Sequence, residues 1–305
     1  MSTRLRNALS AALIALSCLL VPLGALAAWA VYGLADTGRW VTAMAPLAAD
    51  PAVQGAVADT LDDGIMDQVG ARLDTGPAAP APAAVRPFVR EAVRSFTRTE
   101  AFRTAWDTGN RTVHGAVLGA LRDERRGPVT VDLAPVTAQV KRRLTEDHVP
   151  MAARIPVAHT EVSVLRAAEL ERLRKGYDVL DVAGFWLPVS AAALAAAGIA
   201  VAACRRRAVG ATALGTALGG AFLLLAVVIG RRLTLADLPE AAHRPAAGAV
   251  YDALTQTLRT VSWLLIAGGL AVALLCRLTE YLARRRRACA GPAADPAREP
   301  TRARA

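Results

Sequence analysis

The sequence predicts a mainly α-helical protein with four transmembrane helices. A mostly helical extracytoplasmic domain is expected between the first and second of these helices, and two short strands in it can pair as a small sheet. Three observations carry this prediction. Hydrophobic residues make up 54% of the 305 residues, although 20% of the residues are charged. Four long runs contain no charged residue, and arginine is concentrated beside one end of each run.

The four uncharged runs are each long enough to cross the roughly 30 Å hydrocarbon core of a bilayer as a helix. In chain order they cover residues 8–34, 182–204, 208–230 and 260–276. Lipid offers no partner to backbone N–H and C=O groups, so each run is expected to be a hydrogen-bonded helix, with a bend at Pro22. The pattern Ala25-Leu26-Ala27 also fits the cleavage site of a signal peptide. A retained anchor is favoured because the apolar run continues past that site to Leu34.

The placement of arginine predicts the orientation, because the cytoplasmic flanks of transmembrane helices carry an excess of positive charge. Residues 1–7, 205–207 and 277–305 hold 13 basic and three acidic residues, so they are expected inside, the last as a disordered basic tail. Residues 35–181 and 231–259 then form an extracytoplasmic domain and an extracytoplasmic loop. The arginines expected to contact anionic lipid at the inner face are Arg205, Arg206, Arg207, Arg284, Arg285, Arg286 and Arg287.

This topology explains the formal net charge of +10. The positive excess lies on the inner segments, so anionic lipid is the expected partner and nucleic acid is not. Arg231 and Arg232 lie on the outer side against the rule, and Asp237 and Glu240 are expected to neutralise them. The protein is therefore expected in the plasma membrane as a multi-pass protein with both termini in the cytoplasm.

The outer domain is predicted to begin with two helices joined by a linker. Asp50 followed by Pro51 favours a helix start, because the carboxylate can cap the first turn and proline fits the first helical position. Apolar residues then recur at every fourth position, at Val53, Val57, Leu61, Ile65, Val69 and Leu73. Residues 75–87 are rich in alanine and proline and are expected to form a semi-rigid linker. A second helix is expected from about Pro87.

Both helices carry a stripe of like charges at four-residue spacing. The acidic stripe is Asp59, Asp63 and Asp67, opposite the apolar face, and the basic stripe is Arg86, Arg90, Arg94 and Arg98. Like charges four residues apart cost a helix roughly 0.2–0.5 kcal/mol per pair, so some compensation is expected. Three explanations stay open: solvation of both faces, pairing of the two stripes across the linker, or contact of the arginines with an anion such as a lipid headgroup or a cell-wall polymer. Solvation is favoured, because exposed charges cost little.

The rest of the outer domain is predicted from residue spacing. Residues 99–121 form a helical stretch, and the alternating segments 129–133 and 160–164 predict two strands with a further helix between them. No cysteine occurs within 35–181, so an apolar core and not disulfides must stabilise the domain. Apolar residues from Leu170 to Leu180 run into the second span without a breaker, which predicts one long helix. Such a helix could transmit an outside event into the membrane as a rigid shaft.

Sequence motifs for catalysis or cofactor binding are absent. The chain has no G-x-x-x-x-G-K-[ST] phosphate loop and no G-x-S-x-G elbow. Its histidines lack metal-binding spacing and are expected as ordinary surface or core residues; they are His114, His148, His159 and His243. The adjacent carboxylates Asp62-Asp63 are expected on a solvated face, and Asn110-Arg111-Thr112 matches a glycosylation sequon, a pattern that often arises by chance. No enzymatic activity, cofactor or metal is therefore predicted.

The centres of the predicted spans contain no ionisable side chain, which argues against an ion-coupled transporter. Gly215-x-x-x-Gly219 and the alanines of the second and third spans allow two helices to approach closely. Only three arginines connect these two spans. A packed hairpin of the second and third spans is therefore expected.

Four segments resemble an uncharacterised family of integral membrane proteins from high-GC Gram-positive bacteria. They are DTGRWV at 36–41, APLAADPAVQ at 45–54, VDLAPVT at 131–137 and AVYDAL at 249–254. The resemblance covers residues 30–280 loosely. It implies the membrane topology, and it implies no activity and no functional residues.

Two functional hypotheses follow. The favoured one is a non-enzymatic membrane protein that senses, binds or scaffolds through its outer domain, with an unidentified membrane or cell-envelope partner. The alternative is a permease-like subunit of an ABC-type complex, because one span, a large outer domain and three further spans is similar in layout to such subunits. No sequence motif of those families is present.

Overall fold

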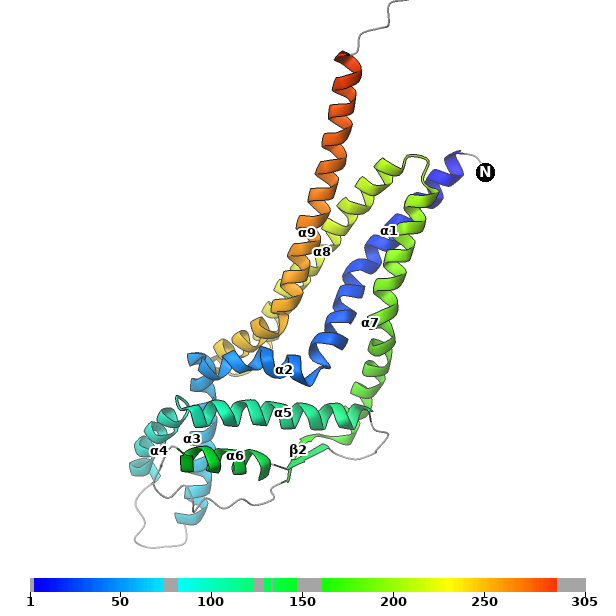
Figure 1. The fold of residues 1–305 in the computed structure, drawn as a ribbon. Coiled ribbons are helices and arrows are strands. Elements are labelled where there is room, and N and C mark those ends of the chain that lie inside the picture. The colour runs from blue at the N-terminus through cyan, green and yellow to red at the C-terminus, as the bar shows by residue number, and fades with distance from the viewer. Residues whose placement is uncertain (1–2, 74–81, 123–128, 133, 147–160, 290–305) are drawn as a thin grey trace, which may run out of the picture.

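The computed structural model describes residues 3–73, 82–122, 129–132, 134–146 and 161–289. The chain forms a bundle of long helices, with a smaller set of elements packed across one end of it (Figure 1). The disordered tail expected at residues 277–305 is wrong for 277–289, which are helical as the end of the last long helix, and 290–305 lie outside the described residues, as do 75–81 of the expected linker. The remainder of that linker, residues 82–87, is helical and not a linker, because the next helix already begins at Pro82.

Among the described residues, four helices are long and apolar enough to cross a membrane, which agrees with the four predicted spans and suggests a multi-pass membrane protein. They are α1 with the π-helical turn η1 (Thr3–Trp29 and Ala30–Leu34), α7 (Ala167–Val201), α8 (Arg205–Ala236) and α9 (Arg244–Cys289). The helices extend beyond the uncharged runs. Residues 231–259, expected as a loop, are mostly helical, since α8 ends at Ala236 and α9 begins after a 3-10 turn (η4, Ala241–His243).

Helices α1 and α7 pack antiparallel through small residues spaced by seven. Ser10 donates a hydrogen bond to the Gly198 carbonyl at 2.7 Å, and Ser17 donates one to the Ala191 carbonyl at 2.8 Å. A Cβ on Gly198 would lie 2.8 Å from Ile14. A seven-residue repeat keeps the same side of two slightly crossed helices in contact, and small residues let their backbones approach closely.

Helix α8 packs mainly on α1 and α9, so the expected hairpin of the second and third spans is wrong. Gly215 and Gly219 allow close packing as expected, but their neighbours are on α1: a Cβ on Gly215 would meet Cys18, and one on Gly219 would lie 3.2 Å from Pro22. A short connection holds only the joined ends of two helices together. Which side chains fill the small-residue faces is decided along their whole length, and here α1 and α9 fill them.

The elements between α1 and α7 form what we call the insert domain. It consists of α2 (Thr37–Met44), η2 (Ala45–Ala49), α3 (Pro51–Leu73), α4 (Pro82–Phe96), α5 (Glu100–Arg122), β1 (Val129–Asp132), α6 (Ala134–Glu146) and β2 (Glu161–Leu165). Strand β1 pairs antiparallel with β2, with Val131 opposite Val162. Helix α3 begins as the sequence predicts, because Asp50 Oδ1 accepts from the backbone N–H groups of Ala52 and Val53 at 2.8 and 3.2 Å.

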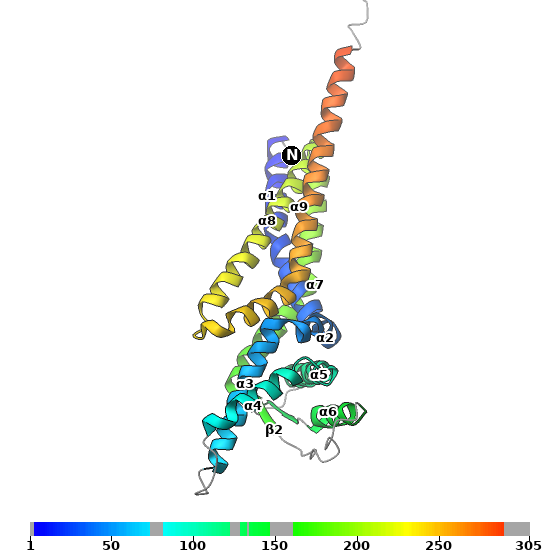
Figure 2. The same ribbon diagram turned by 90° about the vertical axis from the view of Figure 1, so that its left-hand side faces the viewer.

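Helices α2 and α5 lie across the end of the bundle (Figures 1 and 2). Helix α7 runs without interruption from the insert domain into the bundle, as predicted. Two routes therefore connect the insert domain to the long helices. Apart from the direct chain connection of α1 to α2, one is the continuous α7, and the other is the packing of α2, η2 and α3 on the first turns of α9.

Candidate functional site

The strongest candidate site is the core where the insert domain meets α9, which we call the junction core. Met44, Leu47 and Val53 are buried at its centre. Packed against them are side chains from both sides of the junction, namely Trp40, Val57, Trp106, Ala246, Ala249, Val250, Ala253 and Leu254. Three of the four segments that carry the family resemblance, 36–41, 45–54 and 249–254, thus meet in one cluster. The insert domain and α9 share this core and are not merely tethered to one another.

Helix α5 is held on α2 by two indole hydrogen bonds. Trp106 Nε1 donates to the Met44 carbonyl at 2.9 Å, and Trp40 Nε1 donates to Asn110 Oδ1 at 3.3 Å. The Asn110 amide in turn donates to the Trp106 carbonyl at 2.9 Å. The asparagine of the sequon is therefore engaged on both polar atoms inside the domain, which disfavours it as an attachment point for a glycan.

His114 connects α5 to the turn between α1 and α2. Its ring stacks on Trp40 with centroids 4.7 Å apart, Nε2 lies 2.8 Å from the Leu34 carbonyl, and Nδ1 lies 3.1 Å from Thr37 Oγ1. The carbonyl can only accept, so Nε2 carries the proton and Nδ1 accepts from the threonine hydroxyl in the neutral ring. Burial lowers the pKa of His114 below its usual 6.5, and the positive charge of Arg122 lowers it further, against the opposing effects of the Leu34 carbonyl and Asp36.

We expect this histidine to make the insert domain less stable in acid. The folded state holds the His114 proton more weakly than the unfolded chain, so stability is undiminished above about pH 6.5 and falls as the pH drops below it. The slope is at most about 1.4 kcal/mol per pH unit. Urea unfolding of the full chain in detergent, followed by tryptophan fluorescence between about pH 5 and pH 8, measures it. The matched variant His114→Gln should lack this part of the slope; an equal slope in both proteins would contradict the assignment.

The far end of α5 is tied to α1 and α7. Arg122 Nε donates to the Tyr177 hydroxyl at 3.2 Å and Nη2 donates to the Ala35 carbonyl at 3.4 Å. Arg174 on α7 donates to the Ala120 carbonyl at 2.7 Å. Helix α5 therefore contacts the continuous shaft of α7 as well as the junction core.

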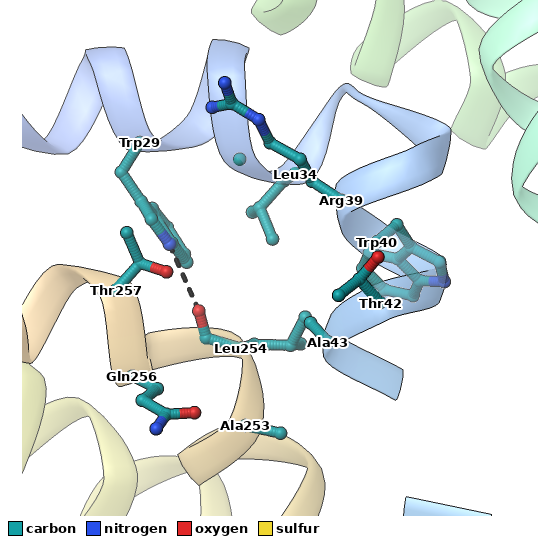
Figure 3. A pocket seen from close by; sticks show the side chains of 11 residues that line it. Trp29, Leu34, Arg39, Trp40, Thr42, Ala43, Ala253, Leu254, Gln256 and Thr257 are labelled. Carbon is teal, nitrogen blue, oxygen red and sulfur yellow. Dashed lines mark hydrogen bonds between the residues drawn. The ribbon is translucent and has the colours of Figure 1, made fainter. Parts of the chain in front are cut away.

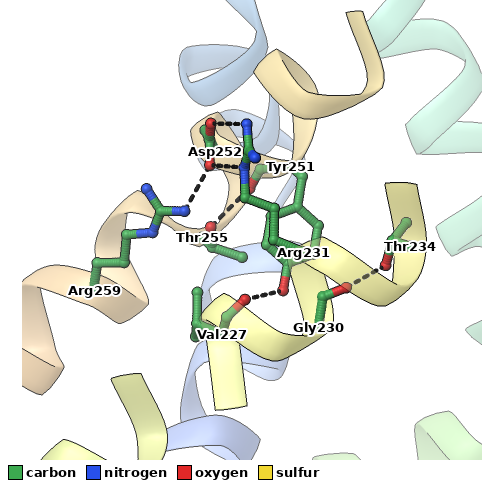
Figure 4. A network of polar contacts seen from close by, with 8 residues as sticks. All are labelled: Val227, Gly230, Arg231, Thr234, Tyr251, Asp252, Thr255 and Arg259. Carbon is green, nitrogen blue, oxygen red and sulfur yellow. Dashed lines mark hydrogen bonds and ion pairs between the residues drawn. The ribbon is translucent and has the colours of Figure 1, made fainter. Parts of the chain in front are cut away.

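A three-residue ion-pair network links α8 to α9 (Figure 4). Arg231 donates to both carboxylate oxygens of Asp252, from Nε at 2.9 Å and from Nη2 at 3.0 Å. Arg259 Nη2 donates to the same carboxylate at 2.6 Å. The expected neutralisation of Arg231 by Asp237 and Glu240 is thus wrong. Asp252 lies on the next helix, α9. Only the antiparallel packing of α8 on α9 brings it to Arg231.

The charged stripes of α3 and α4 meet in part. Arg86 pairs with Asp63 of the acidic stripe, but its Nε also lies 3.2 Å from Asp62 Oδ2, and Arg90 Nη2 reaches the same oxygen at 3.4 Å. Only 2% of the Asp62 side chain is exposed, so its expected place on a solvated face is wrong. The Oδ1 atom of this buried carboxylate has no hydrogen-bond partner among the described residues. The ion pairs with Asp62 raise the pKa of the Arg86 guanidinium.

The other members of the stripes remain outside this cluster. Asp59, Asp67, Arg94 and Arg98 are exposed, and none of them has an ion pair within the described part of the chain. Solvation is the explanation that fits these four. No single explanation therefore applies to a whole stripe. Ion pairing explains some of its residues, and solvation explains the others.

The arginines predicted to contact lipid lie at the opposite end of the bundle from the insert domain. Arg205, Arg206 and Arg207 are exposed at the start of α8, and Arg284, paired with Glu280, is exposed with Arg285 near the end of α9. The helix continues through positions 286 and 287, whose side chains lie outside the described residues. Their contact with anionic lipid stays a prediction.

A pocket of about 480 Å³ opens beside the junction core (Figure 3). It lies between η1, α2 and α9 and is lined by Trp29, Gly33, Leu34, Arg39, Trp40, Thr42, Ala43, Ala253, Leu254, Gln256 and Thr257. Trp29 Nε1 donates to the Leu254 carbonyl at 3.1 Å and so joins α1 to α9 at this pocket. Sequence periodicity could not have found it, because its walls come from segments more than 200 residues apart.

Comparisons with known proteins found no similar protein. No family model matches the chain, and neither a curated protein nor a solved structure matches it. The resemblance to a family of membrane proteins from high-GC Gram-positive bacteria therefore stays a prediction. Within the described residues, no three His, Cys, Asp or Glu side chains gather as a metal site would.

Proposed function

We propose that this chain is a non-enzymatic protein of the plasma membrane whose extracytoplasmic insert domain binds a partner or ligand and transmits the event to a four-helix membrane base. The observation that carries the proposal is the junction core, which is built jointly from the insert domain and α9. A domain that only needed anchoring could be joined by a flexible linker. A shared core instead makes any displacement of α2, α3 or α5 a displacement of α9 as well.

A second connection between the insert domain and the long helices, through α5 and α7, supports the proposed transmission. Arg122 and Arg174 join α5 to α7, which continues as one helix into the membrane base. An event at the insert domain thus reaches α9 through an apolar core and α7 through a continuous backbone. In this proposal both termini and Arg205 to Arg207 lie in the cytoplasm, as the positive excess at that end favours.

The orientation is tested by labelling with a membrane-impermeant maleimide. Cys204 is exposed at the arginine-rich end of the bundle, and Ser95 is exposed on α4 of the insert domain. In intact cells we expect a Ser95→Cys protein to react from outside, while Cys204 reacts only after the membrane is permeabilised. Mass mapping of the labelled peptides separates the two sites. Labelling of Cys204 in intact cells would overturn the proposed topology.

Binding is tested by photocrosslinking in intact cells, with a photoreactive residue in place of Phe88. This side chain is 78% exposed on α4. We expect it to capture a specific envelope component, and addition of that component to the purified protein should change the maleimide reaction rate of Cys204 at the far end. The Trp106→Phe variant lacks the indole bond to Met44 and should transmit less.

A crosslinker at position 206 serves as the control for the same experiment. Capture of a separate ATPase there, with none of the expected capture at position 88, would favour the permease-like alternative over a sensing or binding role. Capture at position 88 without any change at Cys204 would contradict the proposed transmission and leave binding alone.

A further inference from the structure

We propose that the pocket beside the junction core binds the headgroup and first acyl carbons of one anionic phospholipid, taken from the leaflet on the insert-domain side. Its volume of about 480 Å³ lies within the range of small-molecule sites, roughly 300–1,000 Å³. This volume suits the polar end of a lipid and the start of a chain, while the remainder of the chains stays in the bilayer. The proposed orientation makes this the outer leaflet; the lipid site itself does not depend on the sensing function.

The position of the pocket places it at the depth of lipid headgroups. Trp29 and Leu34 stand at the end of the first spanning helix, and Ala253 and Leu254 belong to the helix that forms the fourth. Tryptophan is enriched where apolar chains give way to polar headgroups. The Trp29 N–H is already bonded to the Leu254 carbonyl, so its ring offers the pocket an apolar surface. An occupant can therefore enter from the bilayer with its chain against this wall.

Arg39 supplies the charge that selects an anion. It lines the pocket from α2, and its side chain reaches toward η1 (Figure 3), where Nη1 donates to the Tyr32 carbonyl at 2.8 Å. Among the described residues its guanidinium has no ion pair; the nearby Asp36 carboxylate accepts the backbone N–H of Arg39 instead. A guanidinium held by one bond and free at its other N–H groups is suited to a phosphate, which it can bind through two parallel hydrogen bonds.

Neutral polar groups complete the site. Gln256 and Thr257 line the pocket from α9, and Thr42 lines it from α2. The Thr42 hydroxyl is bonded to the Gly38 carbonyl. The Gln256 and Thr257 side chains have no hydrogen-bond partner among the described residues, so they can bind the glycerol or ester oxygens of a lipid. One cation, a few neutral donors and apolar walls match an anionic amphiphile better than a soluble anion.

Native mass spectrometry of the full-length protein in neutral detergent tests the proposal, with phosphatidylglycerol and phosphatidylcholine as probes. We expect one tightly bound phosphatidylglycerol, held about tenfold more tightly than phosphatidylcholine. Arg39→Gln should lower the phosphatidylglycerol affinity about tenfold and leave phosphatidylcholine unchanged. Thr257→Phe, at an exposed position where a larger side chain can be accommodated, should fill the pocket and weaken both lipids.

The matched control is Arg111→Gln, which removes an exposed arginine of α5 that does not line the pocket. Equal losses in Arg39→Gln and Arg111→Gln would show unspecific attraction and overturn the site, as would unchanged binding in Arg39→Gln. Unchanged binding in Thr257→Phe would place the lipid outside the pocket and overturn it too. Competition by soluble glycerol phosphate at the same concentration as the lipid would show that an anion alone binds. Circular dichroism checks that each variant is folded, and Arg39→Lys, which keeps the charge, should retain most of the preference.

Discussion

Replacing both Arg86 and Arg90 with methionine is expected to destabilise the insert domain strongly. The two arginines are the ion-pair partners of Asp62, whose side chain is only 2% exposed. Methionine keeps much of the length of the side chains but leaves a buried carboxylate without a counter-charge. An uncompensated buried carboxylate costs about 3 kcal/mol, at the lower end of the usual range because the half-exposed arginines leave water close by. Urea unfolding followed by tryptophan fluorescence measures the loss.

Helix α4 and the turn that follows it provide the matched control for this change. Arg94 and Arg98 belong to the same stripe but are exposed, without an ion pair to a described residue, so their replacement by methionine should change stability by less than about 0.5 kcal/mol. Adding Asp62→Asn to the first double variant should recover most of the loss, because the amide carries no charge to neutralise. If the two arginine pairs proved equally important, the stripe and not the buried carboxylate would be the stabilising feature.

This cluster shows what helix periodicity can predict and what it cannot. The four-residue spacing predicted an apolar and a charged face on α3, because each residue turns by a fixed angle around one helix, and Val53 of the apolar face is buried. It placed Asp62 in solvent and Leu61 and Ile65 in the core, yet Asp62 is buried and the two aliphatic side chains are each 39% exposed. The neighbouring helix decides which face is covered. Here α4 covers the face at Asp62 because its long arginines can neutralise the carboxylate.

The four long apolar helices were the most predictable part of the fold. A bilayer demands long uncharged helices, so hydrophobic runs identify them from the sequence alone. Their ends were less predictable. Helix α9 continues through Asp252 and Arg259, which break the uncharged pattern but pair with Arg231 and with each other. Paired charges are tolerated where single charges are not, and the pairing depends on contacts between helices that a local pattern does not contain.

The candidate site could be predicted least, for the same reason. The junction core joins residues 40–57, Trp106 and the first turns of α9, and no spacing rule relates segments so far apart. The sequence did contain one trace of it, because three of the four segments noted for their family resemblance meet there. These segments thus marked the place, while its shape and its pocket came only from tertiary packing.

Replacing Gly269 with alanine is expected to cost about 2 kcal/mol, although alanine is the better helix former. A Cβ at this position of α9 would lie 2.5 Å from the Ala213 carbonyl oxygen and 2.9 Å from the Ala217 backbone nitrogen. Both atoms belong to the backbone of α8, so no side chain can rotate away and the two helices must separate. The neighbouring Gly268→Ala is the matched control, since a Cβ there meets nothing within 4 Å. It should leave stability unchanged or raise it by up to about 1 kcal/mol.

Unfolding in mixed micelles with increasing sodium dodecyl sulfate, followed by circular dichroism, compares the two variants. A second-site change identifies the cause of the loss. Ala217→Gly removes the Cβ that lies 2.9 Å from the new methyl group but leaves the Ala213 carbonyl in place, so it should recover little of the stability of Gly269→Ala. Full recovery would mean that two side chains and not two backbones limit the approach of α8 and α9. In that case the close contact at Gly269 would be adjustable packing, and the α8–α9 pair would be less rigid than the backbone distances imply.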